Sequence, residues 1–380
     1  MERRKHDNGG TVTTRVICAV CFLAFTFLWL YEFQADLLAV AQHVLSGGVT
    51  HYNRTVGAII ITAVLFLLQL AVYAVTRLSH RAHALTYAPS FLALTFLSDI
   101  NVNNDNSVEV GRWWWLLVIM IPAWIGAVWL ARQMLPFSDT NKRPSDIFSA
   151  RTWMNLVQMA AMMLFVAFIG NTNAVLHFRA HAETALLRGD NHEAIRVGWE
   201  SLETDRHLTM LRAYALSREG LLGEKLFCYP VAGSADDLLP MRSKPLLLPA
   251  DSIWRHLGGK PAFPMKAHTY YRLLEADSLA TPAVADYALC GKLIDRDLKA
   301  FARLLPHYYD ISPTLPRHYR EALVIYKHKY PNKIGFQDAN IEEEWLQLQK
   351  LKEQYPVESE RRVQVLEKFR NTYWHYYESK

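Results

Sequence analysis

The first half of this 380-residue chain contains long apolar stretches without charged residues, and these constrain its fold more than any other feature. A helix needs roughly 20 residues to cross the hydrocarbon core of a bilayer, which is about 30 Å thick. Four stretches approach or exceed this length: Val16–Tyr31, Thr55–Thr76, Trp113–Ala131 and Thr152–Leu176. Inside a bilayer every backbone N–H and C=O must be bonded within the segment, so each stretch is predicted to be a transmembrane helix.

A fifth stretch, His83–Ser98, has two interpretations. It is about 16 residues long and contains Pro89-Ser90, which suits a re-entrant segment as well as a complete span. If it spans, one side of the membrane receives only Arg54 and Arg112. The other side then receives Arg3, Arg4, Lys5, Arg15, Arg77, Arg81, Arg132, Lys142, Arg143 and Arg151. If it does not span, the contrast falls to seven basic residues against five. Because basic residues collect on the cytoplasmic side, we predict five spans, with the N-terminus inside and the C-terminus outside.

A cleavable signal peptide is an alternative interpretation of the N-terminus, since Ala39-Val40-Ala41 resembles a cleavage site after a basic and then apolar stretch. However, Glu32 and Asp36 lie between the apolar stretch and that site, where a cleavable signal is uncharged. We therefore expect the first span to be retained.

The second half has the charge density of a water-soluble domain. Residues 175–380 hold 29 of the 41 Lys and Arg and 27 of the 36 Asp and Glu. Apolar residues at helical spacing predict helices at Ala180–Arg188, Asn191–Ser201, Arg206–Arg218, Leu221–Phe227, Ala283–Leu293, Leu298–His307, Tyr319–Lys329, Ile341–Tyr355 and about Glu358–Tyr377. The predicted fold is all-α, with a multi-pass transmembrane domain over residues 1–176 and an extracytoplasmic helical domain over residues 177–380.

Helix pairs in this second domain resemble tetratricopeptide repeats. The stretch Glu183–Phe227 carries the resemblance best and Asp286–Tyr330 more loosely, with Ala at close-contact positions and Pro at boundaries. Ala185–Arg188 and Ala215–Arg218 echo each other at an offset of 30 residues. An irregular helical bundle is the alternative. The proline-rich stretch Tyr229–Pro264 interrupts the pattern and is expected to be a loop over the helices, anchored by Leu246, Leu247 and Leu248.

Two further sequences carry a resemblance that covers most of the chain: Tyr87-Ala88-Pro89-Ser90 in the third stretch and Leu315–Leu323, which reads LPRHYREAL, in the second half. With them, the chain resembles an uncharacterised family of bacterial multi-pass membrane proteins that have a tetratricopeptide-like C-terminal region. This resemblance implies a location in the bacterial inner membrane and a helical fold, and it implies no activity.

Three polar residues near the outer end of the first span form the most suggestive group. Glu32, Asp36 and His43 share one face if the helix continues, and a divalent cation would relieve the repulsion between the two carboxylates. Asp99 is expected at the same level, so Glu32, Asp36 and Asp99 are candidate catalytic residues. Carboxylates in a first outer loop resemble those of membrane glycosyltransferases that use lipid-linked sugars. The alternative is that all of them are hydrated residues at helix ends.

The cysteines and motifs point to no other chemistry. Cys18 and Cys21 lie inside an apolar span, where they are expected to pack, and Cys228 and Cys290 are either paired or free thiols. Asn155 and Gln158, in the last span, are expected to join helices. Phosphate-binding, dinucleotide-binding and zinc-protease motifs do not occur in the sequence.

The leading functional hypothesis is a non-catalytic inner-membrane protein whose N-terminus is cytoplasmic and whose outward helical domain binds a protein or peptide. Its other partner is membrane lipid, and a net charge of +5 without a basic stripe argues against nucleic acid. No cofactor is predicted. The alternative is an envelope transferase, or a subunit of one, that uses the outer carboxylates with a divalent cation.

Overall fold

The computed structural model describes residues 3–78, 82–103, 107–111, 113–133, 150–331 and 334–378. The chain forms two compact units, Met1–Asn173 and Ala174–Lys380. The regular secondary structure of the described residues is helical apart from one two-stranded hairpin. The boundary lies three residues before the predicted one, because the last predicted span is interrupted: α6 ends at Ile169 and a new helix begins at Ala174.

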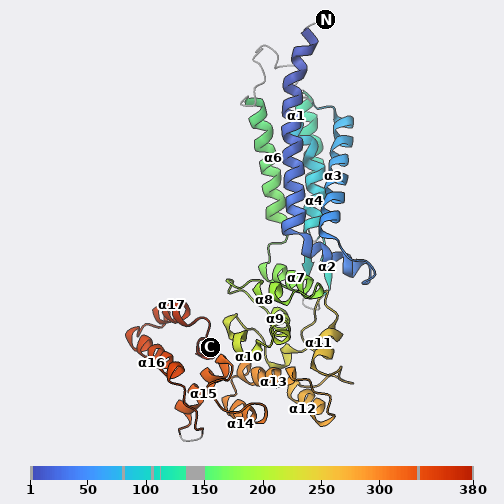
Figure 1. Cartoon of the computed structure of the whole chain (residues 1–380). Helices are drawn as coiled ribbons and strands as arrows, with labels where there is room; N and C mark the ends of the chain where they lie inside the picture. The colour runs from blue at the N-terminus through green and yellow to red at the C-terminus, as the bar shows by residue number, and fades with distance from the viewer. Residues whose placement is uncertain are drawn as a thin grey trace. The chain divides into compact units, whose positions relative to one another are not determined.

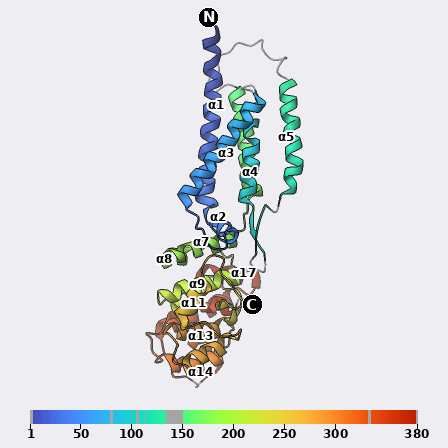
Figure 2. The same ribbon diagram turned by 90° about the vertical axis from the view of Figure 1, so that its right-hand side faces the viewer.

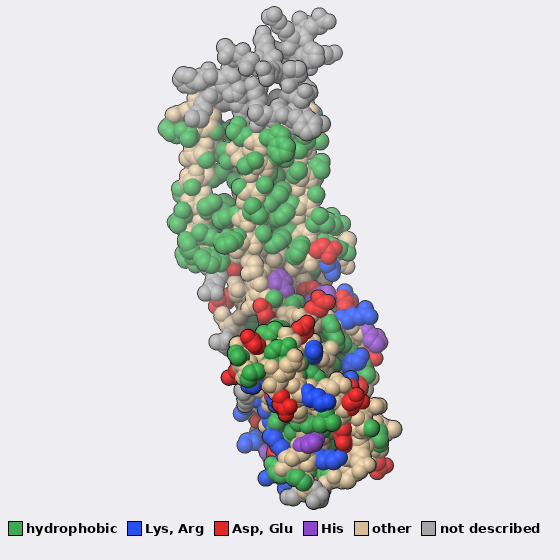
Figure 3. Space-filling view, turned by 90° about the vertical axis from the view of Figure 1, so that its left-hand side faces the viewer, with side chains coloured by type: hydrophobic (Ala, Val, Ile, Leu, Met, Phe, Trp, Pro, Cys, Tyr) green, Lys and Arg blue, Asp and Glu red, His purple; other side chains and the backbone are tan. Residues whose placement is uncertain are grey.

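The first unit is a bundle of apolar helices (Figures 1 and 2). Its elements are α1 (Arg3–Leu28), the π-helical turn η1 (Trp29–Phe33), α2 (Ala35–Leu45), α3 (Arg54–Thr76), the 3₁₀ turn η2 (His83–Tyr87), α4 (Ala88–Ser98), β1 (Ile100–Val102), β2 (Val108–Val110), α5 (Trp115–Gln133) and α6 (Ala150–Ile169). Within the described residues, four helices are long and apolar enough to cross a membrane: Val12–Phe33, Arg54–Thr76, Trp115–Gln133 and Thr152–Ile169. Hydrophobic side chains cover the visible face of this unit, as Figure 3 shows. Many large ones are exposed, and the side chain of Phe168 is 86% exposed. Such a surface suits lipid and not water.

The doubtful stretch His83–Ser98 folds as one turn of 3₁₀-helix followed by α4. Pro89 lies in the first turn of α4, where its missing N–H costs no hydrogen bond. At the rises typical of the two helix types, η2 and α4 together are about 26 Å long. The stretch is therefore nearly as long as a membrane is thick, although it is too short to count among the four long helices.

Hydrogen bonds show that this stretch runs along the whole bundle. Near its start, the Ala84 N–H donates to Asn155 Oδ1 at 2.8 Å, close to the beginning of α6. At its end, the Asn171 N–H donates to the Ser98 carbonyl at 3.2 Å, just after α6. The chain thus passes five times between the two ends of the first unit. Asn155 joins two segments, which confirms the role predicted for it from the sequence.

The second unit is built from helices joined by short turns. They are α7 (Ala174–Leu187), α8 (Asn191–Arg196), α9 (Arg206–Arg218), α10 (Leu222–Lys225), η4 (Leu226–Cys228), η5 (Ala235–Leu238), α11 (Ala250–Leu257), α12 (Ala267–Ala276), α13 (Ala283–Ile294), α14 (Leu298–Tyr308), α15 (Arg317–Lys329), α16 (Ala339–Gln354), α17 (Glu358–Phe369) and α18 (Tyr373–Glu378). The helices α11 and α12 and the turn η5 are not predicted from the sequence. The expectation that Tyr229–Pro264 is a loop throughout is therefore wrong in part, because η5 and α11 lie inside it. Charged side chains are scattered over the visible face of this unit (Figure 3).

The internal echo in the sequence corresponds to two helices that end alike. After α7 and α9 the chain turns at Gly189 and Gly220, both with positive φ, which is a common way to end a helix. However, α8 has six residues and α10 only four, so the pairs are unequal. The tetratricopeptide resemblance therefore stays a prediction.

One predicted helix, Glu358–Tyr377, is in fact two. α17 ends at Phe369, and α18 begins at Tyr373. Tyr373 and Trp374 are fully buried, and the Tyr373 N–H donates to Glu321 Oε2 at 2.7 Å. The helix breaks because docking these two aromatic residues on α15 outweighs continuing in a straight line.

The predicted loop Tyr229–Pro264 is anchored at the predicted leucines. The backbone N–H groups of Leu246, Leu247 and Leu248 all donate to the Glu183 carboxylate of α7, at 2.5–2.9 Å. Glu183 is fully buried, and burial raises the pKa of its carboxyl while the three N–H groups oppose that rise. One side chain thus satisfies three otherwise orphaned backbone donors.

Glu183→Ala is expected to release this loop. It leaves three buried N–H groups without acceptors, which should destabilise the loop by roughly 3–5 kcal/mol. Hydrogen exchange of residues 239–249 in the detergent-solubilised chain measures the effect. Glu200→Ala, at an exposed carboxylate in the same unit, is the control and should leave the exchange unchanged. Equal exchange in both variants would contradict the anchoring role.

Candidate functional site

Glu32 lies at the end of α1, in the turn η1, and forms an ion pair across the bundle. Arg54 Nη2 of α3 lies 3.0 Å from Glu32 Oε2, and both side chains are partly exposed. Arg54 Nε also donates to the Tyr31 carbonyl at 2.6 Å, and the guanidinium lies over the Tyr31 ring. The structure therefore offers an internal cation as the partner of Glu32.

The expectation that Glu32, Asp36 and His43 share one face of a continued helix is wrong. The chain leaves the helical path at Gln34, and α2 then turns away from the direction of α1 (Figure 1). The His43 ring lies against Gly48, at the end of its own helix. Among the residues that the structure describes, no three His, Cys, Asp or Glu side chains gather closely enough to hold a metal ion. A metal or catalytic role for these residues stays a prediction.

Asp99 is buried and closes the hairpin that follows α4. Its carboxylate accepts hydrogen bonds from Asn101 Nδ2 at 2.7 Å and from the Trp113 N–H at 2.8 Å. Its carbonyl accepts the Gly111 N–H at 2.7 Å. Gly111 has a φ of +72° and lies against the Phe96 ring, where a Cβ would collide. These bonds give Asp99 a structural role at the end of the bundle, and its predicted catalytic role is untested.

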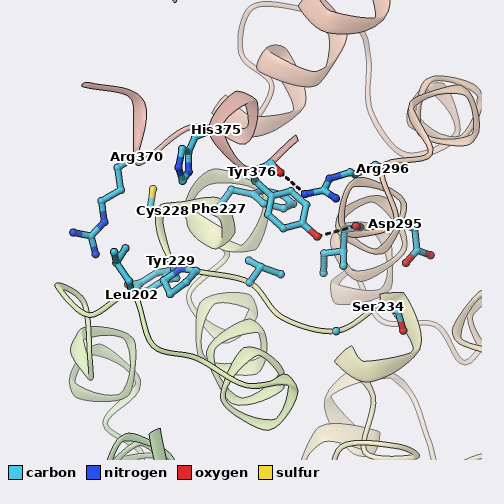
Figure 4. A pocket seen from close by; sticks show the side chains of 14 residues that line it. Leu202, Phe227, Cys228, Tyr229, Ser234, Asp295, Arg296, Arg370, His375 and Tyr376 are labelled. Atoms are coloured by element: carbon cyan, nitrogen blue, oxygen red, sulfur yellow. Dashed lines mark hydrogen bonds between the residues drawn. The ribbon is translucent and has the colours of Figure 1, made fainter. Parts of the chain in front are cut away.

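The second unit contains a cleft of about 580 Å³, here called the central cleft. Its wall combines aromatic and aliphatic side chains with charged ones, and Figure 4 shows those used below. They come from the turn η4 and its continuation (Phe227, Cys228, Tyr229), from the end of α13 (Asp295, Arg296) and from the segment around α18 (Arg370, His375, Tyr376). This volume and this mixture are typical of small-ligand and peptide sites.

Two guanidinium groups lie on opposite sides of the central cleft (Figure 4). Arg296 has a φ of +58°, which is uncommon for a residue with a side chain, and it lies over the Tyr376 ring. Its Nη2 donates to the Tyr376 carbonyl at 2.5 Å, whereas its buried Nε has no hydrogen-bond partner among the described residues. Arg370 Nη2 donates to the Trp199 carbonyl at 3.0 Å. Both arginines are thus held in place with donors to spare.

One histidine lies between them. Burial, and next the charge of Arg370, lowers the pKa of His375 below its ordinary value, which favours the uncharged imidazole. Asp295 is the only carboxylate among the residues that line the cleft. The cleft is therefore aromatic in the middle and on balance positive, which suits the backbone and acidic groups of a bound peptide.

Cys228, on the cleft wall, begins a chain of contacts that resembles a nucleophilic triad. Cys228 Sγ lies 3.9 Å from His318 Nε2, and His318 Nδ1 lies 3.0 Å from Glu321 Oε2. A carboxylate only accepts hydrogen bonds, so Nδ1 carries the proton. Nε2 then accepts the Phe227 N–H at 3.2 Å. His318 and Glu321 are fully buried and were not predicted as site residues, although both lie in the LPRHYREAL sequence.

The chemistry of this group favours a structural role. Burial, and next the charge of Glu321, raises the pKa of the Cys228 thiol to about 11. At neutral pH only roughly one thiol in ten thousand is then ionised, whereas catalytic cysteines have depressed pKa values. His318 is already bonded to the backbone. The group therefore connects α15 to the turn η4, and Cys228 and Cys290 are both free thiols.

The fold and the cleft together define a class of protein: helical proteins with several apolar helices of membrane-spanning length and a second helical unit that contains a cleft. Residues 266–380 match the model of DUF6057, a family of unknown function. No curated protein and no solved structure matches the chain significantly. The matched segment includes His318, Glu321 and the α18 side of the central cleft, whereas Cys228 lies outside it.

The reactivity of Cys228 tests the structural role. In a Cys18→Ser, Cys21→Ser background, alkylation by iodoacetamide should rise about tenfold per pH unit from pH 7 to 9.5, without levelling near 8.5 where an ordinary thiol does. Cys290 is fully buried and should not react in the folded protein. A Glu200→Cys variant that lacks Cys228 supplies the ordinary profile. A plateau for Cys228 at or below pH 8.5 would indicate an activated nucleophile instead.

Proposed function

We propose that this is an integral protein of the bacterial inner membrane that binds a protein or peptide partner through its outward helical unit and has no catalytic role of its own. The observation that carries the proposal is the central cleft: its centre is aromatic, two positioned arginines flank it, and its thiol is protonated. A binding site needs such anchors and has no need of an activated group.

The arrangement of the first unit supports the orientation. Five passages place the start of α1 and residue 173 at opposite ends of the bundle. Arg15 lies over the Tyr73 ring and Arg132 donates to the Thr76 carbonyl, so both arginines lie at the N-terminal end. Arg54 is at the other end. The remaining basic residues of the predicted inner side include Arg81, Lys142 and Arg143, which lie outside the described residues. By the positive-inside rule, the end with the N-terminus is cytoplasmic.

Cysteine labelling in intact cells tests this orientation. In a variant without the four native cysteines, Ser107→Cys in the β1–β2 hairpin should react with a membrane-impermeant maleimide. A cysteine at Thr140, in the predicted inner loop Asp139–Ile147 outside the described residues, should react only after the cells are lysed. The reverse pattern would put the helical unit in the cytoplasm.

Photo-crosslinking tests partner binding at the central cleft. A benzoylphenylalanine at Leu202, which lines the cleft, should yield a discrete crosslinked protein in membranes, whereas one at exposed Leu279 should not. Arg370→Glu should reduce the yield at least fivefold, and the exposed Arg303→Glu is the charge-matched control. Equal yields at Leu202 and Leu279, or no effect of Arg370→Glu, would contradict binding in this cleft.

A further inference from the structure

A second cavity, of about 860 Å³, lies among the last four helices and is here called the C-terminal groove. Its walls come from α15, α16, α17 and α18, all within the segment that matches the family model. Figure 1 shows α15, α16 and α17 in this part of the chain. His375 lines both the groove and the central cleft, so the two cavities adjoin at α18.

The floor of the groove is apolar and rigid. Trp345 is stacked on His328 with ring centroids 5.7 Å apart, and it packs edge-to-face on the buried Trp374 at 5.4 Å. Val365 and Ile325 complete the floor, and both are buried. A tryptophan fixed in this way loses little entropy when a partner covers it, which is why such residues dominate binding energies.

The rim of the groove carries more positive than negative charge. Its two carboxylates are already paired: Glu358 with Arg362 at 2.5 Å and Glu378 with Lys352 at 2.8 Å. The two remaining cations are Lys329 and Arg361, which have no carboxylate partner among the residues that the structure describes. Lys329 Nζ donates to the Tyr377 hydroxyl at 2.6 Å, and it lies over the same ring.

A hydrogen-bond donor without a partner adds to the excess of positive charge in the groove. Gln349, on the groove wall, has a buried Nε2 with no hydrogen-bond partner in the described part of the chain. A buried amide donor that lacks a partner costs free energy, and an acceptor oxygen from a bound molecule would recover it. The groove thus combines an apolar floor, two unmatched cations and one unmatched donor. All three polar features favour a ligand that supplies acceptor oxygens and negative charge.

We infer that the C-terminal groove binds an acidic amphipathic segment of a protein partner, with apolar side chains on Trp345 and carboxylates toward Lys329 and Arg361. The inference rests on the proposed function and deepens it by naming the chemistry of the partner. A basic segment would face two unmatched cations, and a purely apolar one would leave them without partners. The groove therefore selects by charge, whereas its floor supplies the contact area.

Three fluorescein-labelled helical peptides of 14 residues test the inference on the full chain in detergent. They share leucines at helical spacing and differ only in having Glu, Gln or Lys at the remaining positions. By fluorescence anisotropy at 50 mM salt, the Glu peptide should bind about tenfold more tightly than the Gln peptide, and the Lys peptide should not bind. Raising the salt to 500 mM should remove most of that advantage.

A charge-matched pair of variants locates the site. Lys329→Glu with Arg361→Glu should weaken binding of the Glu peptide at least tenfold. Lys350→Glu with Lys368→Glu changes the net charge equally at two exposed lysines that do not line the groove, and it should leave binding within twofold. Matching circular dichroism melts for both variants establish that each is folded.

Several results would overturn the inference: equal binding of the Glu and Gln peptides, preference for the Lys peptide, equal losses in the two variants, or no binding of the Glu peptide at millimolar concentration. None of these affects the crosslinking test at Leu202. A crosslinked partner at Leu202 together with no peptide binding would refute the groove inference and leave the proposed function in place. Peptide binding without any crosslinked partner at Leu202 would support the groove inference and contradict partner binding in the central cleft.

Discussion

The second unit depends on one buried carboxylate, that of Glu321 on α15. It accepts hydrogen bonds from Arg317 Nε at 2.8 Å and from the Tyr373 N–H at 2.7 Å, and it lies beside His318 Nδ1. Trp374 Nε1 donates to the Glu321 carbonyl as well. These bonds hold α18 against α15. Because α18 is a wall of both the central cleft and the C-terminal groove, these bonds position one wall of each cavity.

Buried polar groups play a similar part at the ends of the first unit. Trp29 Nε1 donates to Ser98 Oγ at 2.8 Å, and Asn171 Nδ2 donates to the Ile100 carbonyl, so η1, α4, β1 and the segment after α6 are joined at one level. Asp99 then closes the hairpin at that level. Inside a lipid bilayer the hydrophobic effect does not drive helices together, so such hydrogen bonds and close packing set their arrangement.

The polar residues singled out from the sequence and those that form cavities are largely different sets. Glu32 is matched by Arg54 and Asp99 by its neighbours, so the structure gives each a partner within the chain. The arginines of the central cleft, Arg296 and Arg370, come from distant segments and show no local pattern. A dense run of rings, Tyr373–Tyr377, with four aromatic residues and one histidine, is the one signal in the sequence that could have drawn attention to α18.

The sequence by itself determined the division into an apolar and a charged half and the positions of most helices, since α9 spans the predicted Arg206–Arg218. Helical hydrogen bonds and apolar periodicity are local, so they can be predicted from neighbouring residues. Only the tertiary structure decided that His83–Ser98 runs the length of the bundle, that the last helix breaks at residues 370–372, and that Cys228, His318 and Glu321 meet. Each of these depends on buried partners far apart in the chain, where the cost of leaving a polar group or a large aromatic ring unpartnered outweighs local preference.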